Sequence, residues 1–483
     1  MRIDEPRPDA TVDRYRQARI AHWDRVARDG GDRPGWSGAY HARLIEIYRL
    51  LVPPGRRVLE LGCGDGDLLA ALAPSVGVGV DFSGAMLDRA SRRHPGLSFV
   101  QADAHDLPLR GPFDVIVLSD LVDDLWDVQR VLEGLAPQCT PRTRVILNSY
   151  SRLWEWPLTA ARRLGLARPL LDQNWLTVGD ISHLLDLAGF ERIRSWREIL
   201  WPFNTPGVAA LLNRAVVKLW PLAHLGLTNV VVARPKPGAE GRARQPTVSV
   251  VVPARNEAGN ILGLFERVPE MGAGTELIFV EGHSTDDTYQ AIASAMQAHP
   301  GRRAALFRQT GRGKGDAVRL GFEHATGQVL MILDADLTVA PEDLPRFYAA
   351  LHSGTGEFIN GVRLVYPMEG QAMRLLNLAG NKFFGLAFSW MLGQPIKDTL
   401  CGTKVLWADD YRLIAANRSY FGDFDPFGDF DLLFGGARLG LKIVDMPIRY
   451  RKRMYGQTNI RRFTHGALLL RMLAYAAARL KFV

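Results

Sequence analysis

Cysteine is scarce in this sequence, and long apolar runs are absent. The three cysteines, Cys63, Cys139 and Cys401, lie far apart and form neither a CxxC pair nor a spacing shared with histidine. Such usage supports neither a disulfide framework nor a zinc site, and it fits a reducing cytosol. The N-terminus lacks the apolar core of a signal peptide, and no apolar run reaches the roughly 18 residues that span a bilayer. We therefore predict neither secretion nor a transmembrane helix.

Internal repeats, low-complexity tracts and a disordered composition are also missing. Of the 483 residues, 47% are hydrophobic and 23% are charged, as in ordinary folded proteins. A chain of this length exceeds what one hydrophobic core supports, so at least two domains are expected. The formal net charge of +8 is compatible with nucleic acid, an anionic membrane surface or a phosphorylated substrate as a partner.

A linker is predicted at residues 234–247, which are rich in proline, glycine and arginine and show no apolar periodicity. On both sides of it, short apolar runs alternate with longer amphipathic stretches, the pattern of βαβ units around a buried parallel sheet. The sequence therefore predicts the α/β fold class, with one doubly wound domain over residues 1–233 and a second over residues 248–483.

The N-terminal half contains a glycine-rich turn, VLELGCGDGDLL, at residues 58–69. A predicted buried strand is followed by Gly62, Gly64 and Gly66 and then by a helical run. Glycines are needed where a strand turns into a helix and a ligand lies against bare backbone, because a Cβ would occupy the place of the ligand. Taken alone, the same pattern also fits an ordinary strand-to-helix turn.

Acids that end the following strands make this pattern more specific. Asp81 ends the run VGVGV, where a carboxylate can accept hydrogen bonds from both ribose hydroxyls of an adenosine. Asp103 ends LSFVQAD, where it would meet the adenine amino group. Asp120 lies in a fourth apolar stretch, FDVIVLSDLVDDL.

These motifs together resemble the class I S-adenosylmethionine-dependent methyltransferases, roughly over residues 40–233. The resemblance implies a Rossmann-like domain in which S-adenosylmethionine is bound by Glu60, Gly62, Gly64, Gly66, Asp81, Phe82, Asp103, Ala104 and Asp120. An NAD-dependent dehydrogenase is disfavoured, because the glycines read GxGxG where the dinucleotide fingerprint reads GxGxxG.

The methyl acceptor cannot be read from the sequence, since methyl transfer needs mainly orientation and exclusion of water. If the acceptor carries a proton, Asp120 or His105 would be the base. Each also fits a plainer description, as a strand-end acid near the cofactor and as a surface histidine. The tryptophan-bearing stretches 154–158 and 173–176 either cover an acceptor pocket or simply pack.

In the C-terminal half, the apolar run VLMIL leads into two carboxylates, Asp334 and Asp336. In a regular strand these side chains would face opposite ways, so the strand must end and the backbone must turn if both serve one site. Two carboxylates suit Mg²⁺ or Mn²⁺ held jointly with a diphosphate, because the ion neutralises the charge of a departing nucleoside diphosphate. A DxD motif alone is common by chance.

Three further polar loops follow predicted strands, at the sheet edge where open α/β folds bind nucleotides. Their order resembles family 2 glycosyltransferases of the GT-A fold across residues 247–465. The resemblance implies an inverting transfer from a nucleotide sugar, with the metal on Asp334 and Asp336 and catalytic roles for Asp336 and Asp398. It implies donor binding by Pro253, Arg255, Asn256, Glu257, Glu281, Ser284, Asp286, Lys314, Gly315, Asp316 and Asp334. Because Glu281, Gly282 and His283 replace the commoner DDGS loop, the base preference is open.

The stretches NGVRLVYPMEG and DTLCGTK look like the branch of dolichyl-phosphate mannose synthase and bacterial polyprenyl-phosphate glycosyltransferases. A phosphate acceptor is already anionic and needs cations to position it more than it needs a base. Arg363, Arg374 and Lys404 are the predicted cations. If the acceptor were a hydroxyl, Asp398 would be the base, although it also fits a simple capping role.

The C-terminal stretch joins a cluster of arginines to an apolar segment, residues 466–483, that Arg471, Arg479 and Lys481 interrupt. An amphipathic helix of this kind lies among lipid headgroups, with its cations on anionic lipids. A terminal helix packed on the domain would look the same. Residues 375–393 could likewise either contact lipid or pack in the core of the domain.

The sequence thus predicts a bifunctional transferase, peripheral on the cytoplasmic face of a membrane, that glycosylates a polyprenyl phosphate or another lipid-linked acceptor and methylates an unknown acceptor. One alternative is a glycosyltransferase with a hydroxyl acceptor and a non-catalytic, regulatory S-adenosylmethionine-binding domain. Another is a basic nucleic-acid-binding methyltransferase, but it lacks an aromatic stacking surface and an NPPY-like run after the fourth strand.

Overall fold

The computed structural model describes residues 8–29, 36–164, 171–238, 245–366, 375–418, 428–453, 455 and 462–482. Contacts within the chain divide it into two compact units, Met1–Lys236 and Pro237–Lys481. The division falls inside the stretch 234–247, although the last strand of the first unit already includes Arg234 and Pro235.

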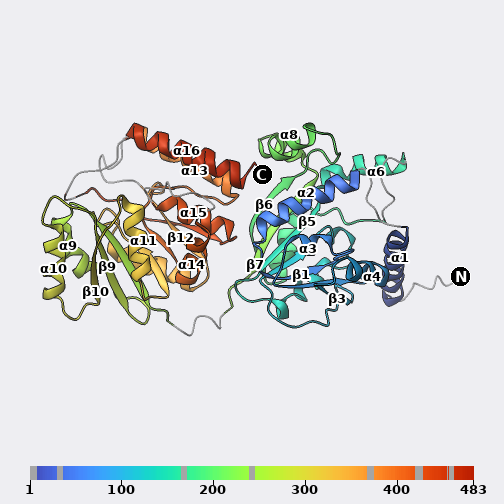
Figure 1. Cartoon of the computed structure of the whole chain (residues 1–483), viewed down its shortest axis with the longest axis horizontal. Helices are drawn as coiled ribbons and strands as arrows, with labels where there is room; N and C mark the ends of the chain where they lie inside the picture. Colours follow the sequence, from blue (N-terminus) through green and yellow to red (C-terminus); the bar gives the residue numbers. More distant parts are fainter. Residues whose placement is uncertain are drawn as a thin grey trace. The chain divides into compact units, whose positions relative to one another are not determined.

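The first unit is built around a seven-stranded sheet with the order β3-β2-β1-β4-β5-β7-β6 (Figure 1). The strands are β1 (Arg57–Leu61), β2 (Val76–Asp81), β3 (Ser98–Gln101), β4 (Val115–Leu118), β5 (Arg144–Tyr150), β6 (Phe190–Glu198) and β7 (Thr228–Pro235). The five strands β3, β2, β1, β4 and β5 run parallel to one another, whereas β7 is antiparallel to both β5 and β6. The predicted parallel sheet is therefore right for five strands and wrong at one edge, because an apolar run does not encode its direction.

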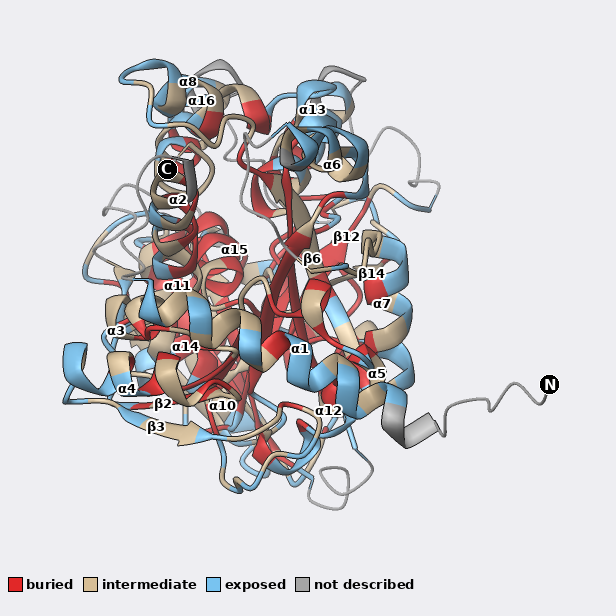
Figure 2. Ribbon diagram, turned by 90° about the vertical axis from the view of Figure 1, so that its right-hand side faces the viewer, coloured by how far each residue is buried: buried red, intermediate tan, exposed pale blue. Residues whose placement is uncertain are grey.

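Helices cover both faces of this sheet. They are α1 (Pro8–Arg28), α2 (Trp36–Leu51), α3 (Asp67–Ala71), α4 (Gly84–Arg93), α5 (Val128–Glu133), α6 (Glu155–Arg163), α7 (Val178–Leu187) and α8 (Val208–Arg214). Leu59 and Leu61 of β1 pack in one apolar cluster and Val58 packs in another, since successive strand side chains point to opposite faces. Figure 2 shows the resulting buried layer of strands in red.

The second unit contains another seven-stranded sheet, with the order β10-β9-β8-β11-β13-β12-β14. Its strands are β8 (Val248–Ala254), β9 (Thr275–Glu281), β10 (Ala304–Arg308), β11 (Val329–Ile332), β12 (Phe358–Val362), β13 (Lys404–Trp407) and β14 (Ile443–Pro447). Strands β8 to β11 are parallel, but β13 is antiparallel to both β11 and β12. This sheet is thus mixed, where the sequence predicted a parallel one.

The helices of the second unit are α9 (Ile261–Arg267), α10 (Thr288–Ala298), α11 (Lys314–His324), α12 (Leu344–His352), α13 (Leu375–Leu392), α14 (Ala408–Ala416), α15 (Asp429–Arg438) and α16 (Arg462–Leu480). The core includes Phe279 of β9, Met331 of β11 and Phe347 of α12. Helix α16 packs against α13. Within the described ranges, no helix is long and apolar enough to cross a membrane.

Candidate active sites

The glycine turn between β1 and α3 is held in left-handed backbone conformations. Gly62, Gly64 and Gly66 have φ angles of 68°, 52° and 75°, which non-glycine residues adopt at a cost. A Cβ at Gly62 would lie 2.8 Å from Leu121, and one at Gly66 would lie 2.8 Å from Phe99. A Cβ at Gly64 would have no atom within 4 Å. Gly62 and Gly66 are therefore needed for packing, whereas the side of Gly64 is open to a ligand.

Asp81, at the end of β2, is tied to this turn. Its Oδ2 accepts a hydrogen bond from Gly64 N at 3.0 Å, and its Oδ1 accepts one from Ser83 N at 2.9 Å. Burial raises the pKa of Asp81, and the backbone hydrogen bonds oppose this shift. The neighbouring Phe82 offers its carbonyl oxygen to Gln101, and Glu60 is buried in β1. The structure thus places the glycines, Glu60, Asp81 and Phe82 around one edge of the sheet.

Asp103 lies at the same edge but already has partners. Arg16 Nε, from α1, donates to its Oδ2 at 2.5 Å, and the backbone and ring of His105 both contact its Oδ1. Burial alone would raise the pKa of Asp103, but hydrogen bonds from His105 and Arg16 bring it well below its usual range. The contact predicted with adenine would therefore compete with Arg16. Ala104, beside it, is buried.

Helix α1 lies along three of the loops at this edge, a feature that the sequence did not reveal. Ser83 Oγ donates to Asp24 at 2.5 Å after β2, and Arg16 pairs with Asp103 after β3. After β4, Arg19 and Trp23 both donate to Asp124, at 2.9 and 3.1 Å. Helix α1 therefore covers the part of the unit in which the cofactor-binding residues are predicted.

The two residues proposed as a methyl-transfer base are both engaged. Asp120 has a φ of 54° and its Oδ1 accepts hydrogen bonds from Tyr40 at 2.8 Å and Asn148 at 2.5 Å. The ring of His105 contacts Asp103 through Nδ1, and its Nε2 accepts from Asp127 N at 3.1 Å. This pattern fixes His105 as the tautomer with the proton on Nδ1. With its side chain 18% exposed and both ring nitrogens engaged, His105 is held as a structural residue and is not the surface histidine that the sequence also allowed.

The tryptophan-bearing stretches separate into two environments. Asn174 donates to the carbonyl oxygens of Val122 and Leu125, which holds Trp175 beside Tyr150, at a ring-centroid distance of 6.3 Å. Trp175 is therefore placed beside the end of β5. Trp156, in contrast, is 78% exposed. Only the stretch 173–176 is positioned to cover an acceptor.

In the second unit, strand β11 ends at Ile332, before the DxD motif. Asp336 Oδ1 accepts hydrogen bonds from Thr338 N at 3.1 Å and Thr338 Oγ1 at 2.7 Å, and Leu337 between them has a φ of 54°. The strand thus ends and the backbone turns as the motif requires. Asp334 pairs with Lys314 Nζ at 2.5 Å.

The backbone of the DTLCGTK stretch lies directly against this ion pair. A Cβ on Gly402 would collide with Lys314 Nζ and with the carboxylate of Asp334. The pKa of Asp334 is lowered: burial would raise it, but Lys314, Arg363 and Lys404 favour the charged form. The two motifs that the sequence separates by more than sixty positions therefore meet at one place.

Arg453 is the main residue of this site that the sequence analysis missed. Its Nη2 donates to Asp336 Oδ2 at 2.6 Å and its Nη1 donates to Glu257 Oε1 at 2.9 Å. Burial raises the pKa of Glu257 to about 7, although Arg453 opposes the shift. The sequence analysis assigned the whole arginine cluster to lipid, and for Arg453 that assignment is corrected by these contacts.

The two loops after β8 and β9 interlock. Asn256, with a φ of 58°, accepts a hydrogen bond from Thr285 N at 2.8 Å, and its own N–H donates to Ser284 Oγ at 3.0 Å. Glu281 accepts from Ser284 N at 2.5 Å, and Asp286 accepts from Thr288 Oγ1 at 2.5 Å. These polar side chains thus shape the loops.

The remaining predicted donor residues lie in or beside these loops. Pro253 belongs to β8, and Arg255 after it is exposed. Gly315 opens α11 with its backbone against Gly428, and Asp316 accepts a hydrogen bond from Gly311 N at 3.1 Å.

Among the predicted acceptor cations, Arg363 has the most defined partner. Its Nε and Nη2 donate to the two oxygens of Asp398 at 2.7 and 2.9 Å, and the backbone N–H groups of Arg363 and Leu400 donate to the same carboxylate. Asp398 is fully buried. Burial would raise its pKa, but Arg363 outweighs this and lowers it. A carboxylate with these donors is better suited to position Arg363 than to accept a proton.

Lys404 is also buried, and its Nζ donates to Asn360 Oδ1 at 3.0 Å and to the carbonyl oxygen of Cys401 at 2.5 Å. It acts on the site through its charge, which favours the ionised form of Asp334. The third predicted cation, Arg374, lies outside the described residues.

A divalent ion would find two carboxylates here, Asp334 and Asp336. Hard oxygen donors of this kind suit Mg²⁺ or Mn²⁺. In the part of the chain that the structure describes, no three His, Cys, Asp or Glu side chains cluster as a complete metal site. The residues present therefore fit an ion only if the phosphate oxygens of a donor supply further ligands.

Comparisons with known families agree with this geometry. Residues 58–141 match the model of a methyltransferase domain, and residues 249–406 match the model of glycosyl transferase family 2. The first match spans the glycine turn and Asp81, and the second spans both loops, the DxD motif and Arg363. The chain carries a methyltransferase domain and a family 2 glycosyltransferase domain. Both domains belong to transferase families.

Individual relatives match only short parts of the chain. The dolichol-phosphate mannosyltransferase of Saccharomyces cerevisiae is 40% identical over 110 residues, which cover 22% of this chain and 40% of the relative. An undecaprenyl-phosphate 4-deoxy-4-formamido-L-arabinose transferase of Klebsiella pneumoniae is 32% identical over 111 residues, or 22% of this chain and 34% of the relative. The chain thus spans well under half the length of these two proteins.

Among solved structures, a methyltransferase described as a possible histamine N-methyltransferase, from Thermotoga maritima, is 17% identical with a TM-score of 0.35. The matched region covers 44% of this chain and 99% of the methyltransferase chain.

Proposed function

We propose that the chain is a bifunctional transferase. Its second unit transfers a sugar, with inversion, from a nucleotide sugar to a polyprenyl phosphate or another lipid-linked acceptor. Its first unit transfers a methyl group from S-adenosylmethionine to an acceptor that is still to be identified. The observation that carries the proposal is the meeting of Asp336, Arg453 and Glu257 at the end of β11, beside the Lys314–Asp334 pair.

Asp334 and Asp336 would hold Mg²⁺ or Mn²⁺ together with the donor diphosphate. The ion, when bound, offsets the negative charge that develops on the departing nucleoside diphosphate. Lys314 and Arg453 already lie on these two carboxylates, so they can turn to the phosphate oxygens when a donor arrives. The loops with Asn256, Ser284 and Asp286 would hold the base and ribose.

A phosphate is the acceptor that the Arg363–Asp398 pair supports. Arg363 is held in place by a buried carboxylate that takes up its Nε and Nη2 donors, and its positive charge would position an anionic phosphate. A phosphate nucleophile needs no base near neutral pH, and the lowered pKa of Asp398 makes it a poor base for a hydroxyl. The two relatives named above act on dolichol phosphate and undecaprenyl phosphate by their names, which agrees with this choice.

The first unit would bind S-adenosylmethionine at the glycine turn. The open side of Gly64 leaves room for the cofactor against backbone. Asp81 would accept the ribose hydroxyls with the lone pairs that Gly64 and Ser83 leave available. Helix α1 would cover the bound cofactor and limit access of water, which methyl transfer requires.

The proposed place of action is the cytoplasmic face of a membrane, because the proposed acceptor is a lipid. Contact through α16 remains a prediction. In this helix Leu469, Met472 and Ala476 are buried, and Leu470 is 50% exposed, so most of its apolar side chains pack on the protein.

The glycosyl transfer can be tested with the purified chain, a panel of radiolabelled nucleotide sugars and undecaprenyl phosphate in detergent. We expect one donor to move label into the organic phase in the presence of Mg²⁺ or Mn²⁺, and Asp336→Asn to lower the rate by about a hundredfold or more. Asp343→Asn, at an acid outside the site, is the control. Failure of every donor, with nucleotide binding intact, would refute the lipid-phosphate acceptor.

A further inference from the structure

One surface of the first unit is covered by apolar side chains. It is formed by residues 152–164, which include α6, and by residues 207–225, which run from α8 through the 3₁₀ turn Val216–Lys218 to the 3₁₀ turn Leu222–Leu225. We call it the apolar face. Its large exposed apolar residues are Leu153, Trp156, Leu164, Val208, Leu211, Leu219, Trp220, Leu222 and Leu225. Elsewhere in the described residues of this unit, such exposure is limited to Val76, Trp126 and Leu187.

The two segments of the apolar face are joined by hydrogen bonds. Trp154 Nε1 donates to the carbonyl oxygen of Leu225 at 2.8 Å, and Ser151 N donates to that of Leu227 at 2.7 Å. The start of α6 and the end of the second segment are therefore neighbours, although about seventy positions separate them in the sequence. The two segments with exposed apolar residues therefore meet at these ends.

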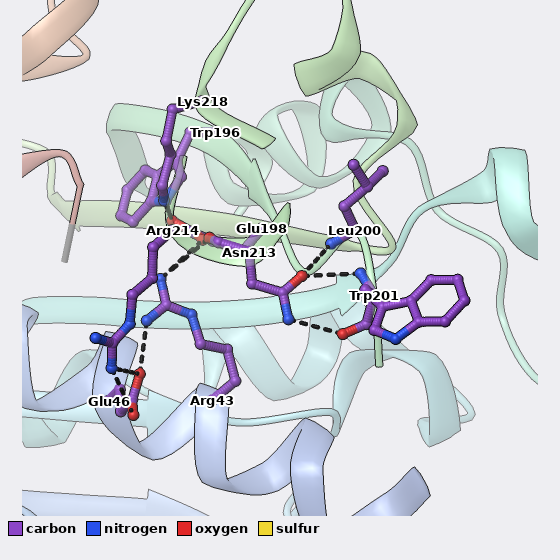
Figure 3. A network of polar contacts seen from close by, with 9 residues as sticks. All are labelled: Arg43, Glu46, Trp196, Glu198, Leu200, Trp201, Asn213, Arg214 and Lys218. Atoms are coloured by element: carbon purple, nitrogen blue, oxygen red, sulfur yellow. Dashed lines mark hydrogen bonds and ion pairs between the residues drawn. The ribbon is translucent and has the colours of Figure 1, made fainter. Parts of the chain in front are cut away.

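Polar side chains of the second segment point inward, as Figure 3 shows for Asn213 and Lys218. Asn213 is buried: its Oδ1 accepts from Leu200 N at 2.9 Å and Trp201 N at 2.8 Å, and its Nδ2 donates to Trp201 O at 2.7 Å. Lys218 is buried against the carboxylate of Glu198. Asn213 and Lys218 thus serve the interior, whereas Arg214 and His224 of the same segment are exposed.

The apolar neighbours of these residues point outward. Leu211 is 61% exposed and Trp220 is 81% exposed. A helix or turn on a water-exposed surface has the opposite arrangement, with its polar side chains outside. An exposed apolar surface of this kind usually marks a contact with a protein or a membrane.

The segment 207–225, with its exposed apolar side chains, is held in place by ion pairs and hydrogen bonds. Glu198, at the end of β6, also accepts a hydrogen bond from Trp196 Nε1 at 2.8 Å, and Arg43 of α2 lies 3.7 Å from its other oxygen (Figure 3). Arg214 of α8 is paired with Glu46 of α2 at 3.2 Å. The segment is therefore fixed to β6 and α2, which keeps its apolar side chains outside.

The charges of the apolar face favour an anionic partner. Residues 199–227 contain no Asp or Glu. In residues 152–164 the one acid, Glu155, lies 3.9 Å from Arg152, and Arg163 is exposed. The exposed Arg163 attracts anionic headgroups. Tryptophan is the residue that prefers the boundary between headgroups and acyl chains, and the face exposes both Trp156 and Trp220.

We propose that the apolar face of the first unit docks on the surface of a bilayer that contains anionic lipids. The tryptophans and leucines enter the headgroup boundary, and Arg163 lies among the lipid phosphates. Docking of this face depends on neither proposed transfer reaction, and it does not require α16.

The test uses the full chain and co-sedimentation with phosphatidylcholine vesicles, with and without phosphatidylglycerol. In the triple variant Trp156→Ser, Leu211→Ser, Trp220→Ser, we expect the partition coefficient on the anionic vesicles to fall about tenfold or more. The matched control is Val76→Ser, Trp126→Ser, Leu187→Ser, which removes exposed apolar side chains from other surfaces of the same unit and should bind as the wild type does.

Equal loss in both triple variants, no loss in either, or a wild type that binds no vesicle would overturn the proposal. A wild type that is dimeric in solution, with the apolar-face variant monomeric, would assign the surface to a second copy of the chain instead. Melting temperature and S-adenosylmethionine binding verify folding, and in the apolar-face variant both should stay at wild-type values because its three substituted side chains are 61–81% exposed. Sugar transfer to a detergent-dispersed acceptor, measured in parallel, keeps this outcome separate from failure of the proposed function.

Discussion

Each acid of the DxD motif is paired with a cation: Asp334 with Lys314, and Asp336 with Arg453. A divalent ion that binds Asp336 without a donor must therefore compete with Arg453. The two ion pairs offset the negative charge of the motif. We expect the binding of a divalent ion to depend on whether donor phosphates are present to receive Arg453.

Replacing Arg453 by alanine should strengthen the binding of Mn²⁺ alone. Because the competing guanidinium is removed and Asp336 and Glu257 lose their shared partner, we expect the affinity to rise by about tenfold. Calorimetry with Mn²⁺ in the absence of nucleotide measures this. Arg451→Ala, two positions away, controls for loss of a nearby positive charge. Unchanged or weaker binding in Arg453→Ala would show that the ion pair does not oppose the metal.

Glu257 should make stability depend on pH in the metal-free protein. Burial raises its pKa from 4.5 to about 7, so the folded state binds the proton more tightly than the unfolded state. Its stabilising contribution is fully present below pH 4.5 and is lost as the pH rises through about 7. Urea unfolding in EDTA should therefore show wild type losing stability relative to Glu257→Gln across this window. Parallel pH curves for the two proteins would contradict the shift.

Asp398 should matter for stability as the partner of Arg363. Asp398→Asn leaves a buried guanidinium without its counter-charge, so the free energy of unfolding should fall by about 3 kcal/mol. Asp409→Asn is the matched control, because Asp409 is exposed and pairs with Arg412 at the surface, where a change of under about 1 kcal/mol is expected. Urea unfolding of both variants measures the two changes in the free energy of unfolding. Equal small losses would mean that the Arg363–Asp398 pair contributes little.

At the scale of elements, the two strand-to-loop turns were readable from the sequence. An apolar run that ends in glycines or acids gives both the strand and the place where it stops, as at Gly62 and Asp334. Contacts made by distant segments were not readable. Arg453 reaches Asp336 across 117 positions, and no local pattern in the arginine cluster distinguishes it from its neighbours.

Helix α1 was unpredictable for the same reason. Its arginines Arg16 and Arg19 resemble any solvated helix face until the fold brings Asp103 and Asp124 against them. The reversed strands β7 and β13 were missed because burial, not direction, determines their composition. Conversely, the contact with Arg363 changes the role expected of Asp398, from a base for a hydroxyl acceptor to a partner that positions Arg363.

The glycine turn offers a test at this scale. Gly64→Ala should weaken S-adenosylmethionine binding by about tenfold or more, because the added methyl group enters the open space beside the turn. Gly55→Ala is the matched control: its φ is 77°, and a Cβ there also meets no atom within 4 Å, so the backbone strain is comparable. Calorimetry measures binding for both. Similar affinities in the two variants would place the cofactor elsewhere.

At the scale of the whole molecule, the chain combines two α/β units that match the models of two different transferase families. The net charge of +8 fits the proposed phosphate-bearing substrates and the proposed anionic lipid surface. Covalent linkage of the two units would keep both proposed activities on one chain but does not by itself show a shared product. The proposed function of the second unit therefore depends most on the claim that the sugar acceptor is a lipid phosphate.

That claim is tested most directly by a pair of acceptors that differ only in the phosphate. The chain is incubated with its preferred nucleotide sugar, a divalent ion and either undecaprenyl phosphate or undecaprenol, and radiolabel in the extracted lipid is measured. We expect transfer to undecaprenyl phosphate alone, and a loss of that transfer in Arg363→Ala. Transfer to undecaprenol, or equal transfer to both lipids, would contradict a phosphate acceptor positioned by Arg363.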